Sequence, residues 1–372
     1  MVSFKDNPMS DNGRKVTWGF LGAAGISQKN WASLQRSENG VLKTVGAREL
    51  SRARSFIENC QASVPFEVVP QAVEGYDAIL EDPEIDAVYI PLPTGLRKEW
   101  VIRAAEAGKH VMCEKPCAAT VADLEEMIAA CKSNGVQFMD GVMFMHNRRF
   151  YRTLEVLAAG EELGIIRRVE SCFSFFGGEE FESNIRLDPR LEPDGCLGDL
   201  GWYCIRLSLC AFQRETPHAV RGFLLQEKNG VPVEMRGDLL FDEGRIASFH
   251  CSFNTTLEQS CRISGTEGVL TYDDFVQPLD GEDTSFFVTK LKPHQDGCNY
   301  TTFLDRKEVK VPGKATNSPD CQEALLFRTF GECVLAGTPD PSWPEISLLT
   351  QRVVEALRES AQQGGSPISL RG

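Results

Sequence analysis

Lys115 is the residue of this chain best suited to reaction chemistry. It follows a short apolar segment, His110–Cys113, and is flanked by Glu114 and Pro116. The segment is typical of a buried parallel strand, and ligands bind at the carboxyl ends of such strands in open α/β sheets. Pro116 disfavours helical backbone angles at Lys115, so the ammonium group is held in one direction. The alternative is a solvated Glu–Lys pair on the surface.

A turn near the N-terminus has the composition of a phosphate-binding loop. It reads Gly22-Ala23-Ala24-Gly25-Ile26, follows a predicted strand and leads into a predicted helix. Against the pattern G-x-G-x-x-G, Gly22 keeps the first position, whereas Ala24 and Ser27 replace the other two glycines. Ala24 adds only one methyl group, so a pyrophosphate at the helix N-terminus stays compatible with the sequence. The alternative is an ordinary tight strand-to-helix turn.

The residues after the second predicted strand indicate which nicotinamide cofactor binds. An acidic residue there bonds the ribose 2′-hydroxyl of NAD, whereas an arginine accommodates the 2′-phosphate of NADP. The chain has Arg48, then Glu49, and Arg52 one helical turn later. The two arginines favour NADP(H), and Glu49 is interpreted as an acid at a helix start. NAD(H) is the alternative cofactor.

Asp199 and Tyr203 form a second pair suited to proton transfer. They are four residues apart in a segment where glycines precede a predicted helix, so they share one helical face. A tyrosine phenol can donate a proton to a carbonyl being reduced when a nearby ammonium lowers its pKa. The alternative is that Asp199 caps the helix and Tyr203 is a core aromatic residue.

The first part of the chain alternates strand-like and helix-like segments. Strands are expected at Val16–Leu21, Val41–Ala47, Phe66–Val69, Ala87–Ile90, His110–Cys113 and Val136–Met139. Helices are expected between them at Ile26–Ser37, Ser51–Cys60, Val73–Glu81, Leu96–Ala107 and Val121–Ser133. This alternation predicts an α/β fold, a Rossmann domain with a doubly wound parallel sheet over residues 1–142.

The pattern changes after residue 143 to strands with alternation or hairpin turns. Strands are expected at Arg168–Phe176, Gly237–Phe241, Ile246–Phe253, Cys261–Ser264 and Val269–Tyr272. Helices are expected at Tyr151–Leu157, near Asp199, and at Ser347–Ser360. Residues 143–372 are therefore predicted to form an α+β domain with a mainly antiparallel sheet.

The charge balance excludes several classes of partner. The 372 residues include 53 acidic and 39 basic ones, a formal net charge of −14, without a Lys/Arg block. Nucleic acid and anionic membranes are therefore not expected as partners, and a small-molecule substrate is. No apolar run reaches about 18 residues and the polar N-terminus lacks the pattern of a secretory signal, so we expect a cytoplasmic protein without a membrane span.

The cysteines point to a reducing compartment rather than to a metal site. The chain has thirteen cysteines, none of them spaced Cys-x-x-Cys. Several, such as Cys204 and Cys251, lie inside apolar runs, where cysteine behaves as a small hydrophobic residue. Cys113 and Cys117 flank the Lys115 motif without a visible second ligand cluster. We therefore predict no metal.

Several motifs occur in a fixed order along the chain. They are the loop at Gly22–Ile26, Asp82-Pro83-Glu84-Ile85-Asp86-Ala87-Val88-Tyr89-Ile90-Pro91, Ala107-Gly108-Lys109-His110-Val111-Met112-Cys113-Glu114-Lys115-Pro116, and Gly195–Tyr203. Through these motifs and their order, the chain resembles the glucose-fructose oxidoreductase, inositol dehydrogenase and MocA (Gfo/Idh/MocA) family. It looks most similar to the branch of dimeric dihydrodiol dehydrogenase, bacterial sugar dehydrogenases and plant oxidoreductase-family proteins. The resemblance extends from Val16 to about Leu370.

The resemblance implies roles for residues of this chain. The family's reactive lysine corresponds to Lys115, and its helix acid and terminal acid/base to Asp199 and Tyr203. In this family the N-terminal domain carries the cofactor, whereas the C-terminal domain has an open sheet, closes the site and commonly mediates dimer contact. The resemblance therefore implies that residues 143–372 bind substrate and that the protein forms a homodimer through that open sheet. The sequence departs from the family at Ala24, at Arg97, where a histidine is usual, and at Asp194, where glycine is frequent. These departures leave the substrate open.

The sequence thus predicts an NAD(P)-dependent oxidoreductase that moves a hydride between nicotinamide and a carbonyl or secondary alcohol. The substrate is expected to be a sugar, a polyol or a dihydrodiol-like molecule. Cofactor contacts are predicted at Gly22, Ala23, Ala24, Gly25, Ile26, Arg48, Arg52, Pro91, Pro93, Thr94, Glu114 and Lys115. Substrate contacts are predicted at His146, Arg148, Asp199 and Tyr203; for His146 and Arg148 the alternative is linker side chains bonded to the backbone.

Two other functions stay open at the level of sequence. A reductase of a specialised metabolite, such as an imine or a conjugated carbonyl, needs the same cofactor but not Asp199. A non-catalytic cofactor-sensing regulator on the same scaffold needs neither Lys115 nor Tyr203, although both are present.

Overall fold

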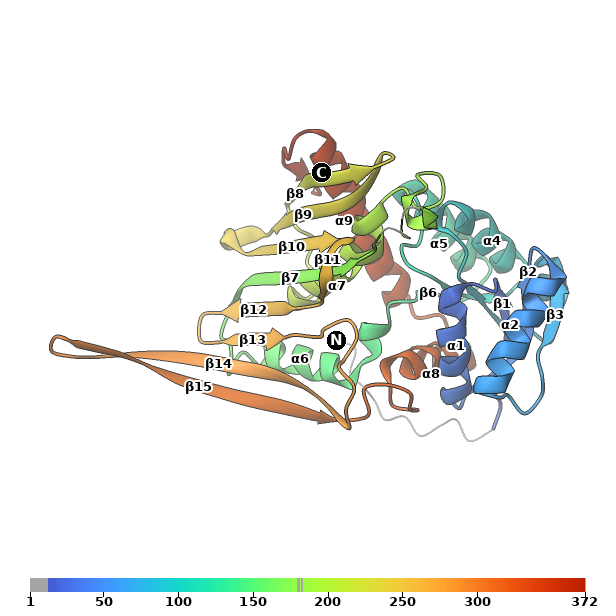
Figure 1. The fold of residues 1–372 in the computed structure, drawn as a ribbon, viewed down its shortest axis with the longest axis horizontal. Helices are drawn as coiled ribbons and strands as arrows, with labels where there is room; N and C mark the ends of the chain where they lie inside the picture. Colours follow the sequence, from blue (N-terminus) through green and yellow to red (C-terminus); the bar gives the residue numbers. More distant parts are fainter. Residues whose placement is uncertain (1–12, 179–180, 182, 372) are drawn as a thin grey trace. The chain divides into compact units, whose positions relative to one another are not determined.

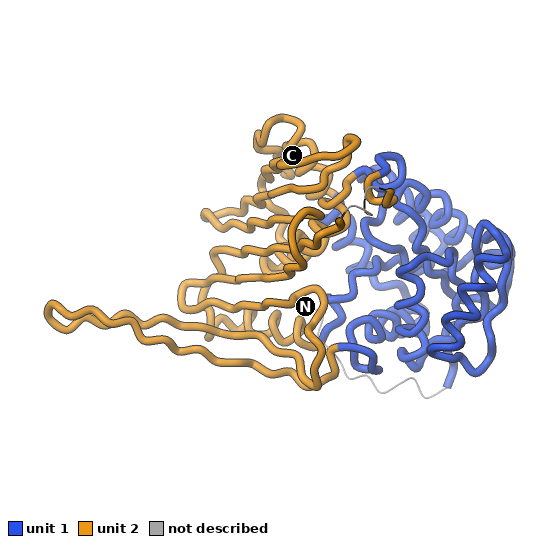
Figure 2. Tube along the Cα trace, in the orientation of Figure 1, with its two compact units in different colours: residues 1–147, 188–193, 316–351 blue, residues 148–187, 194–315, 352–372 orange. Residues whose placement is uncertain are grey.

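The computed structural model describes residues 13–178, 181 and 183–371, which form two compact units (Figure 2). The first unit runs through Asn147 and includes Asp188–Pro193 and Thr316–Gln351. The second comprises Arg148–Leu187, Asp194–Ala315 and the residues from Arg352 onward. The chain thus returns twice to the first unit. The functional division into residues 1–142 and 143–372 stays a prediction.

The first unit is built on a parallel sheet, as the strand and helix alternation predicts. Within the described residues it has six strands in the order β3-β2-β1-β4-β5-β6. Their bounds are Val16–Leu21 (β1), Gly40–Ala47 (β2), Gln71–Glu74 (β3), Ala87–Ile90 (β4), His110–Cys113 (β5) and Phe138–Asp140 (β6). This is the strand order of a dinucleotide-binding Rossmann fold, with its crevice at the carboxyl ends of β1 and β4.

Helices connect these strands, because apolar residues recur along one face of each connecting segment. They are Gly25–Arg36 (α1), Leu50–Ser63 (α2), Asp77–Glu81 (α3), Thr94–Glu106 (α4) and Val121–Ser133 (α5). In α5 the side chain of Thr120 accepts a hydrogen bond from the backbone of Asp123, and Leu124, Met127 and Cys131 are buried. The cap and the apolar spacing therefore fix both the start and the orientation of this helix.

The prediction of a strand at Phe66–Val69 is wrong. Phe66 is buried and packs edge-to-face on Trp31, with ring centroids 5.1 Å apart, whereas Val68 and Val69 are 78 % and 61 % exposed. The third strand lies instead at β3, after Pro70, and the helix expected at Val73–Glu81 shortens to α3. In the segment Phe66–Val69, Phe66 is therefore buried by its contact with Trp31 and not by strand pairing.

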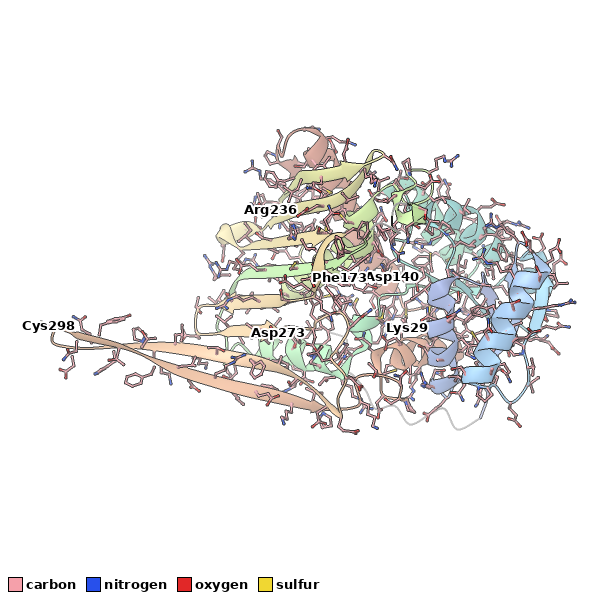
Figure 3. The ribbon with its side chains drawn as sticks, viewed as in Figure 1. Lys29, Asp140, Phe173, Arg236, Asp273 and Cys298 are labelled. Atoms are coloured by element: carbon pink, nitrogen blue, oxygen red, sulfur yellow. The ribbon has the colours of Figure 1, made fainter. Side chains whose placement is uncertain are left out.

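A late segment of the chain completes the first unit, and the sequence did not indicate it. Gln322–Leu335 forms α8, which contacts α1, β1 and β2. Trp18 of β1 packs on Phe327 and Phe330 of α8, with ring centroids 5.2 and 5.0 Å apart. Lys29 of α1 forms an ion pair with Glu323 at 2.7 Å (Figure 3). Helix α8 therefore stabilises strand β1 from more than 300 positions away in the sequence, since Trp18 and Phe327 are 309 positions apart.

The second unit contains a large mixed sheet. In the described residues it has ten strands, ordered β15-β14-β13-β12-β7-β10-β9-β8-β16, with β11 paired to β7. The pair β7–β10 is parallel and the other pairs of named strands are antiparallel, as expected for a mainly antiparallel sheet. The strands are Ile166–Phe176 (β7), Ala219–Lys228 (β8), Val231–Leu240 (β9), Ile246–Ser252 (β10), Asn254–Glu258 (β11), Cys261–Gly265 (β12), Val269–Tyr272 (β13), Asp283–Asp296 (β14), Asn299–Pro312 (β15) and Ile368–Ser369 (β16).

Helices pack on one face of this sheet. They are Arg148–Ala159 (α6), Trp202–Ala211 (α7), preceded by a π-helical turn at Leu197–Gly201, and the second half of Ser342–Gln362 (α9). In β10 the residues Ala247, Phe249 and Cys251 are buried, and α7 contacts this strand. Ser248 and His250 alternate with them and are half-buried on the opposite face. The sheet thus has a helix-covered face and a polar face, the open face.

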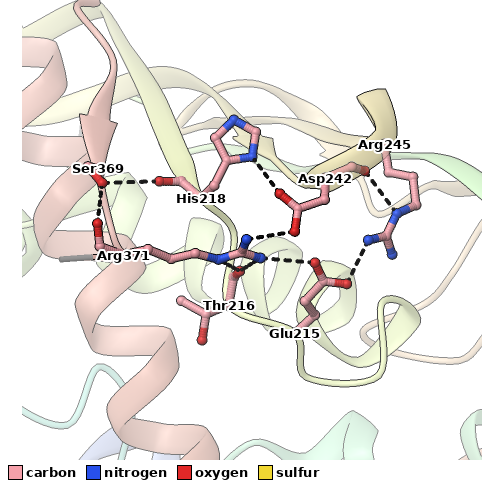
Figure 4. A network of polar contacts seen from close by, with 7 residues as sticks. All are labelled: Glu215, Thr216, His218, Asp242, Arg245, Ser369 and Arg371. Carbon is pink, nitrogen blue, oxygen red and sulfur yellow. Dashed lines mark hydrogen bonds and ion pairs between the residues drawn. The ribbon is translucent and has the colours of Figure 1, made fainter.

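Strands β14 and β15 form a long hairpin that extends beyond the neighbouring strand β13 (Figure 1). Cys298 lies at its exposed tip (Figure 3). At the opposite edge, the C-terminal Arg371 donates to Glu215 at 3.0 Å and to Asp242 at 2.6 Å (Figure 4). These contacts tie the end of the chain to the turns that flank β8 and β9.

No helix within the described part of the chain combines the length and the apolar character needed to cross a membrane.

Candidate active site

The turn after β1 has the geometry of a phosphate-binding loop. Gly22 has a φ of +144°, and a Cβ there would lie 3.2 Å from the side chain of Pro91. The Ser27 hydroxyl donates to the Gly22 carbonyl at 3.0 Å and closes the turn. Gly25, the first residue of α1, is exposed, and a Cβ on it would meet no atom of the described residues within 4 Å. The helix N-terminus therefore has room for an anion.

Arg48 and Arg52 are both exposed near the carboxyl end of β2, and Glu49 is the residue that precedes α2. Burial raises the pKa of Tyr76, and the positive charges of Arg48 and Arg52 act in the opposite direction. Both guanidinium groups therefore lie close enough to Tyr76 to influence it. This arrangement suits a 2′-phosphate on a ribose bound beyond β2.

The segment after β4 is partly closed by other residues of the first unit. Pro91 and Thr94 are buried and Pro93 is half-buried. The backbone and hydroxyl of Thr94 donate to the carboxylate of Glu192 at 3.1 and 2.6 Å. Glu192 thus caps the first turn of α4, a role that the sequence did not reveal. Contact of Pro93 and Thr94 with the nicotinamide stays a prediction.

Glu114 is held in a buried network immediately before Lys115. Asn30 donates to the Tyr89 hydroxyl at 2.5 Å, and that hydroxyl donates to the Glu114 carboxylate at 2.7 Å. Burial, followed by the Glu114 charge, raises the pKa of Tyr89 well above its usual value. Tyr89 therefore stays neutral and keeps its proton for Glu114. A Cβ on Gly141 would lie 3.1 Å from this carboxylate, so any larger residue there would require the Glu114 side chain to shift.

Lys115 is half-buried at the carboxyl end of β5, where the sequence predicts it. Its backbone N–H donates to the Glu114 carboxylate at 3.3 Å. Because Tyr89 and Asn30 belong to β4 and α1, the network joins three elements behind the lysine. A fixed backbone of this kind suits a residue that must present its ammonium group to a reacting oxygen.

In the second unit, Asp199 lies in the π-helical turn and Tyr203 in α7. Asp199 accepts a hydrogen bond from Arg186 Nε at 2.6 Å, a partner that the sequence did not reveal. Tyr203 is 3 % exposed and packs edge-to-face on Phe173, with ring centroids 5.4 Å apart. π-Helical turns are frequent at functional sites, so this turn fits a site residue at Asp199.

His146 and Arg148, which the sequence predicts as substrate contacts, differ in their surroundings. His146 is 1 % exposed and its ring stacks on Trp343, with centroids 4.9 Å apart. Arg148 is half-buried at the start of α6. The packing of His146 favours a structural role, and contact of either residue with substrate stays a prediction.

The open face of the second unit's sheet has a shallow depression of about 480 Å³. Arg236, His250 and Asp273 are among its lining residues (Figure 3 labels Arg236 and Asp273). His250 contacts Glu234 at 2.9 Å. The residues described here contain no group of three or more His, Cys, Asp or Glu arranged to hold a metal ion.

Two family models match the chain. Residues 16–142 match the oxidoreductase family with an NAD-binding Rossmann fold, and residues 151–271 match the GFO/IDH/MocA C-terminal domain. The first match covers the strands β1 to β6 and the phosphate-binding loop, and the second covers much of the mixed sheet.

Characterised relatives include two kinds of dehydrogenase. The chain is 33 % identical to D-xylose 1-dehydrogenase (NADP(+)) 2 of Haloferax volcanii over 94 % of this chain and 99 % of that protein. It is 30 % identical to trans-1,2-dihydrobenzene-1,2-diol dehydrogenase of Bos taurus over 68 % of this chain and 73 % of that protein.

Solved structures have the same fold. The 3-ketoreductase of Actinomadura kijaniata in complex with NADP and TDP-benzene matches with a TM-score of 0.78 at 25 % identity, over 93 % of this chain and 98 % of that one. Aldose-aldose oxidoreductase of Caulobacter crescentus, complexed with glycerol, matches with a TM-score of 0.78 at 26 % identity, over 96 % and 100 %. With its Rossmann unit, its phosphate-binding loop and these relatives, the chain belongs to the GFO/IDH/MocA family of NAD-binding oxidoreductases.

Proposed function

We propose that the protein is an NADP(H)-dependent dehydrogenase or reductase of a sugar, polyol or dihydrodiol. The observation that carries the proposal is Lys115, half-buried at the carboxyl end of β5 and backed by the Glu114–Tyr89 contact. The names of the relatives support the substrate class, since they include a xylose dehydrogenase and a dihydrodiol dehydrogenase.

In the proposed mechanism two residues handle the proton. The Lys115 ammonium donates a hydrogen bond to the reacting oxygen, and the Tyr203 hydroxyl gives its proton to that oxygen during reduction or regains it during oxidation. Asp199 orients Lys115 or a substrate hydroxyl. When bound, the nicotinamide supplies or accepts the hydride at the carbon that bears this oxygen.

The preference for NADP(H) is supported by the two cations after β2. The positive charges of Arg48 and Arg52 both lower the pKa of Tyr76. In the described segment from the end of β2 to the first turn of α2, Glu49 is the only acidic residue that could bind a ribose hydroxyl instead. The xylose dehydrogenase relative is named for NADP, and the 3-ketoreductase was crystallised with it. The cofactor contacts of the loop from Gly22 to Ile26 and of Pro91 are part of this proposal.

We further propose a cytoplasmic homodimer that forms through the open face of the second unit's sheet. The thirteen cysteines are all thiols, which suits a reducing compartment. Along β10 the residues point alternately to the helix-covered face and to the open face. The open face carries half-buried polar residues such as Ser248 and His250. A large exposed sheet face of this kind is suited to pairing with a second copy.

A substrate panel tests the proposed function. The protein is incubated with NADP⁺ and sugars, polyols or dihydrodiols, and with NADPH and the matching carbonyl compounds or imines, while NADPH absorbance is followed. Turnover of a sugar, polyol or diol pair is expected. Turnover of imines or conjugated carbonyls alone would contradict the substrate class, and NADPH binding without any turnover would favour a cofactor sensor.

A further inference from the structure

Arg97 is a buried cation whose hydrogen bonds go to backbone carbonyl groups. It is 5 % exposed and lies in the first turn of α4. Its Nε donates to the Leu92 carbonyl at 2.6 Å, and its Nη1 donates to the Pro116 carbonyl. Leu92 follows β4 and Pro116 follows β5, so one guanidinium joins the two segments that leave adjacent parallel strands.

These contacts lie directly beside Lys115. Pro116 is the next residue in the chain, and on the other side the Glu114 carboxylate is bonded by Tyr89 at 2.7 Å. The charge of Arg97 also acts on Tyr89, where it lowers a pKa that burial raises. Arg97 therefore holds the residue after Lys115, whereas the network of Tyr89 and Glu114 holds the residue before it. The backbone of Lys115 is therefore held on both sides, through Glu114 before it and Pro116 after it.

The chemistry of arginine explains why this side chain suits the position. A buried carbonyl needs a donor, and the rigid guanidinium fork supplies several donors at fixed angles. A lysine offers a single ammonium on a flexible stem, which reaches the two carbonyls less well. Burying a charge against carbonyls alone is also a costly way to stabilise a fold. The arrangement is better explained by a need for exact backbone geometry at Lys115.

We propose that Arg97 is a positioning residue for Lys115: by tying the Leu92 and Pro116 carbonyls together, it fixes the direction in which the ammonium group points. This inference rests on the proposed role of Lys115 in the reaction. It assigns to Arg97 an effect on turnover that acts through the backbone, without contact to substrate.

The test compares Arg97→Gln and Arg97→Lys with Arg103→Gln. Arg103 lies on the same helix, is 40 % exposed and pairs with Asp77, so its variant controls for loss of an arginine from α4. Two measurements are made. Hydrogen–deuterium exchange is followed in peptides that span residues 113–118, and kcat, KM and NADPH affinity are measured with the best compound of the panel.

In Arg97→Gln we expect exchange of residues 113–118 to speed up by about tenfold, because the hydrogen bond to the Pro116 carbonyl and its link to the Leu92 carbonyl are lost. We expect kcat to fall by about 100-fold, since a small misplacement of a reacting group has this effect, while NADPH affinity changes by less than about threefold. Arg97→Lys should recover part of kcat, and Arg103→Gln should behave like the wild type.

Unchanged exchange in Arg97→Gln would overturn the proposal, and so would faster exchange with kcat within about twofold of wild type. If Arg97→Gln does not fold, Arg97→Lys carries both measurements. The exchange experiment needs no substrate. If no compound of the panel is turned over, the proposed function fails on its own, while exchange still decides whether Arg97 orders the backbone at Lys115.

Discussion

The preference for one nicotinamide cofactor depends on a few side chains at the carboxyl end of β2. Arg48 and Arg52 are exposed there, and both act on the pKa of Tyr76. A guanidinium binds a phosphate through charge-assisted, often bidentate hydrogen bonds, whereas it gains little from a ribose hydroxyl. The cations should therefore matter for NADPH and not for NADH.

We predict that Arg48→Ala raises the KM for NADPH by about tenfold and changes the KM for NADH by less than about twofold. The measurement is the initial rate at varied concentrations of each cofactor. Arg54→Ala, which removes an exposed arginine from the nearby helix α2, is the matched control. An unchanged KM for NADPH in Arg48→Ala would mean that the 2′-phosphate is not bound by this residue.

At this scale the sequence located Lys115 and the turn at Gly22 because a strand pattern and a local motif precede each of them. It could not reveal Tyr89 as the partner of Glu114, since the two are 25 positions apart and meet only through the pairing of β4 with β5. The Arg186 partner of Asp199 was missed for a similar reason, because it comes from a separate short 3₁₀ turn.

Strand β5, which carries Lys115 at its end, is held at its start by His110. The ring Nδ1 of His110 accepts a hydrogen bond from the backbone of Gln137 at 2.9 Å, so this nitrogen must be unprotonated. Burial lowers the pKa of His110, Asp86 acts in the raising direction, and Arg14 adds to the lowering. The folded protein therefore binds a proton at His110 less readily than the unfolded chain does.

From this direction we predict a loss of stability on acidification. The contribution of His110 is complete above about pH 6.5, the usual histidine pKa, and is lost as the pH falls below it toward the lower folded-state pKa. The free energy of unfolding should therefore drop more between about pH 7.5 and pH 5.5 in the wild type than in His110→Gln, whose amide can still accept from Gln137. Urea unfolding at both pH values measures this.

The exposed His294 of the hairpin supplies the control for this experiment. His294→Gln should keep the pH dependence of the wild type. If the free energy of unfolding of His110→Gln falls as much on acidification as that of the wild type, a group other than His110 causes the loss of stability.

At the scale of elements, prediction succeeded where the pattern is local. The helix at Val121–Ser133 was predicted with its observed bounds, because its cap and its apolar spacing lie within the segment. Strand β3 was misplaced, because Phe66 is buried by Trp31 outside any strand while Gln71–Glu74 has a weak, half-exposed pattern. Helix α8 was missed, because its partner Trp18 is far away in the sequence.

At the scale of the molecule, the open face of the second unit's sheet is the surface proposed to pair two copies. Thr271 lies on this face, since it alternates in β13 with the buried Leu270 and Tyr272. We predict that Thr271→Glu raises the dimer dissociation constant by at least about tenfold, because it places a charge in a face that the second copy would desolvate. Sedimentation velocity at several concentrations measures this.

Ser133→Glu, on an exposed position of α5, adds the same charge outside the open face and should leave the assembly unchanged. A Thr271→Glu protein with the same mass distribution as the wild type would show that this face does not form the dimer.

In the proposed mechanism Lys115 and Tyr203 act together on one proton transfer. We predict that Lys115→Met and Tyr203→Phe each lower kcat by about 10²–10⁴-fold while NADPH affinity is retained, since each removes half of the proton-handling pair. Residues that act as a unit have non-additive effects, so the double variant should be hardly slower than the worse single variant.

The most direct measurement is therefore the double-variant cycle of kcat for Lys115→Met and Tyr203→Phe on the best compound of the panel, with NADPH affinity measured in parallel. Each single variant is expected to lose much of kcat, and the two losses are not expected to multiply in the double variant. Near-wild-type turnover in either single variant, or a double variant whose loss equals the product of the two single losses, would contradict the proposed mechanism.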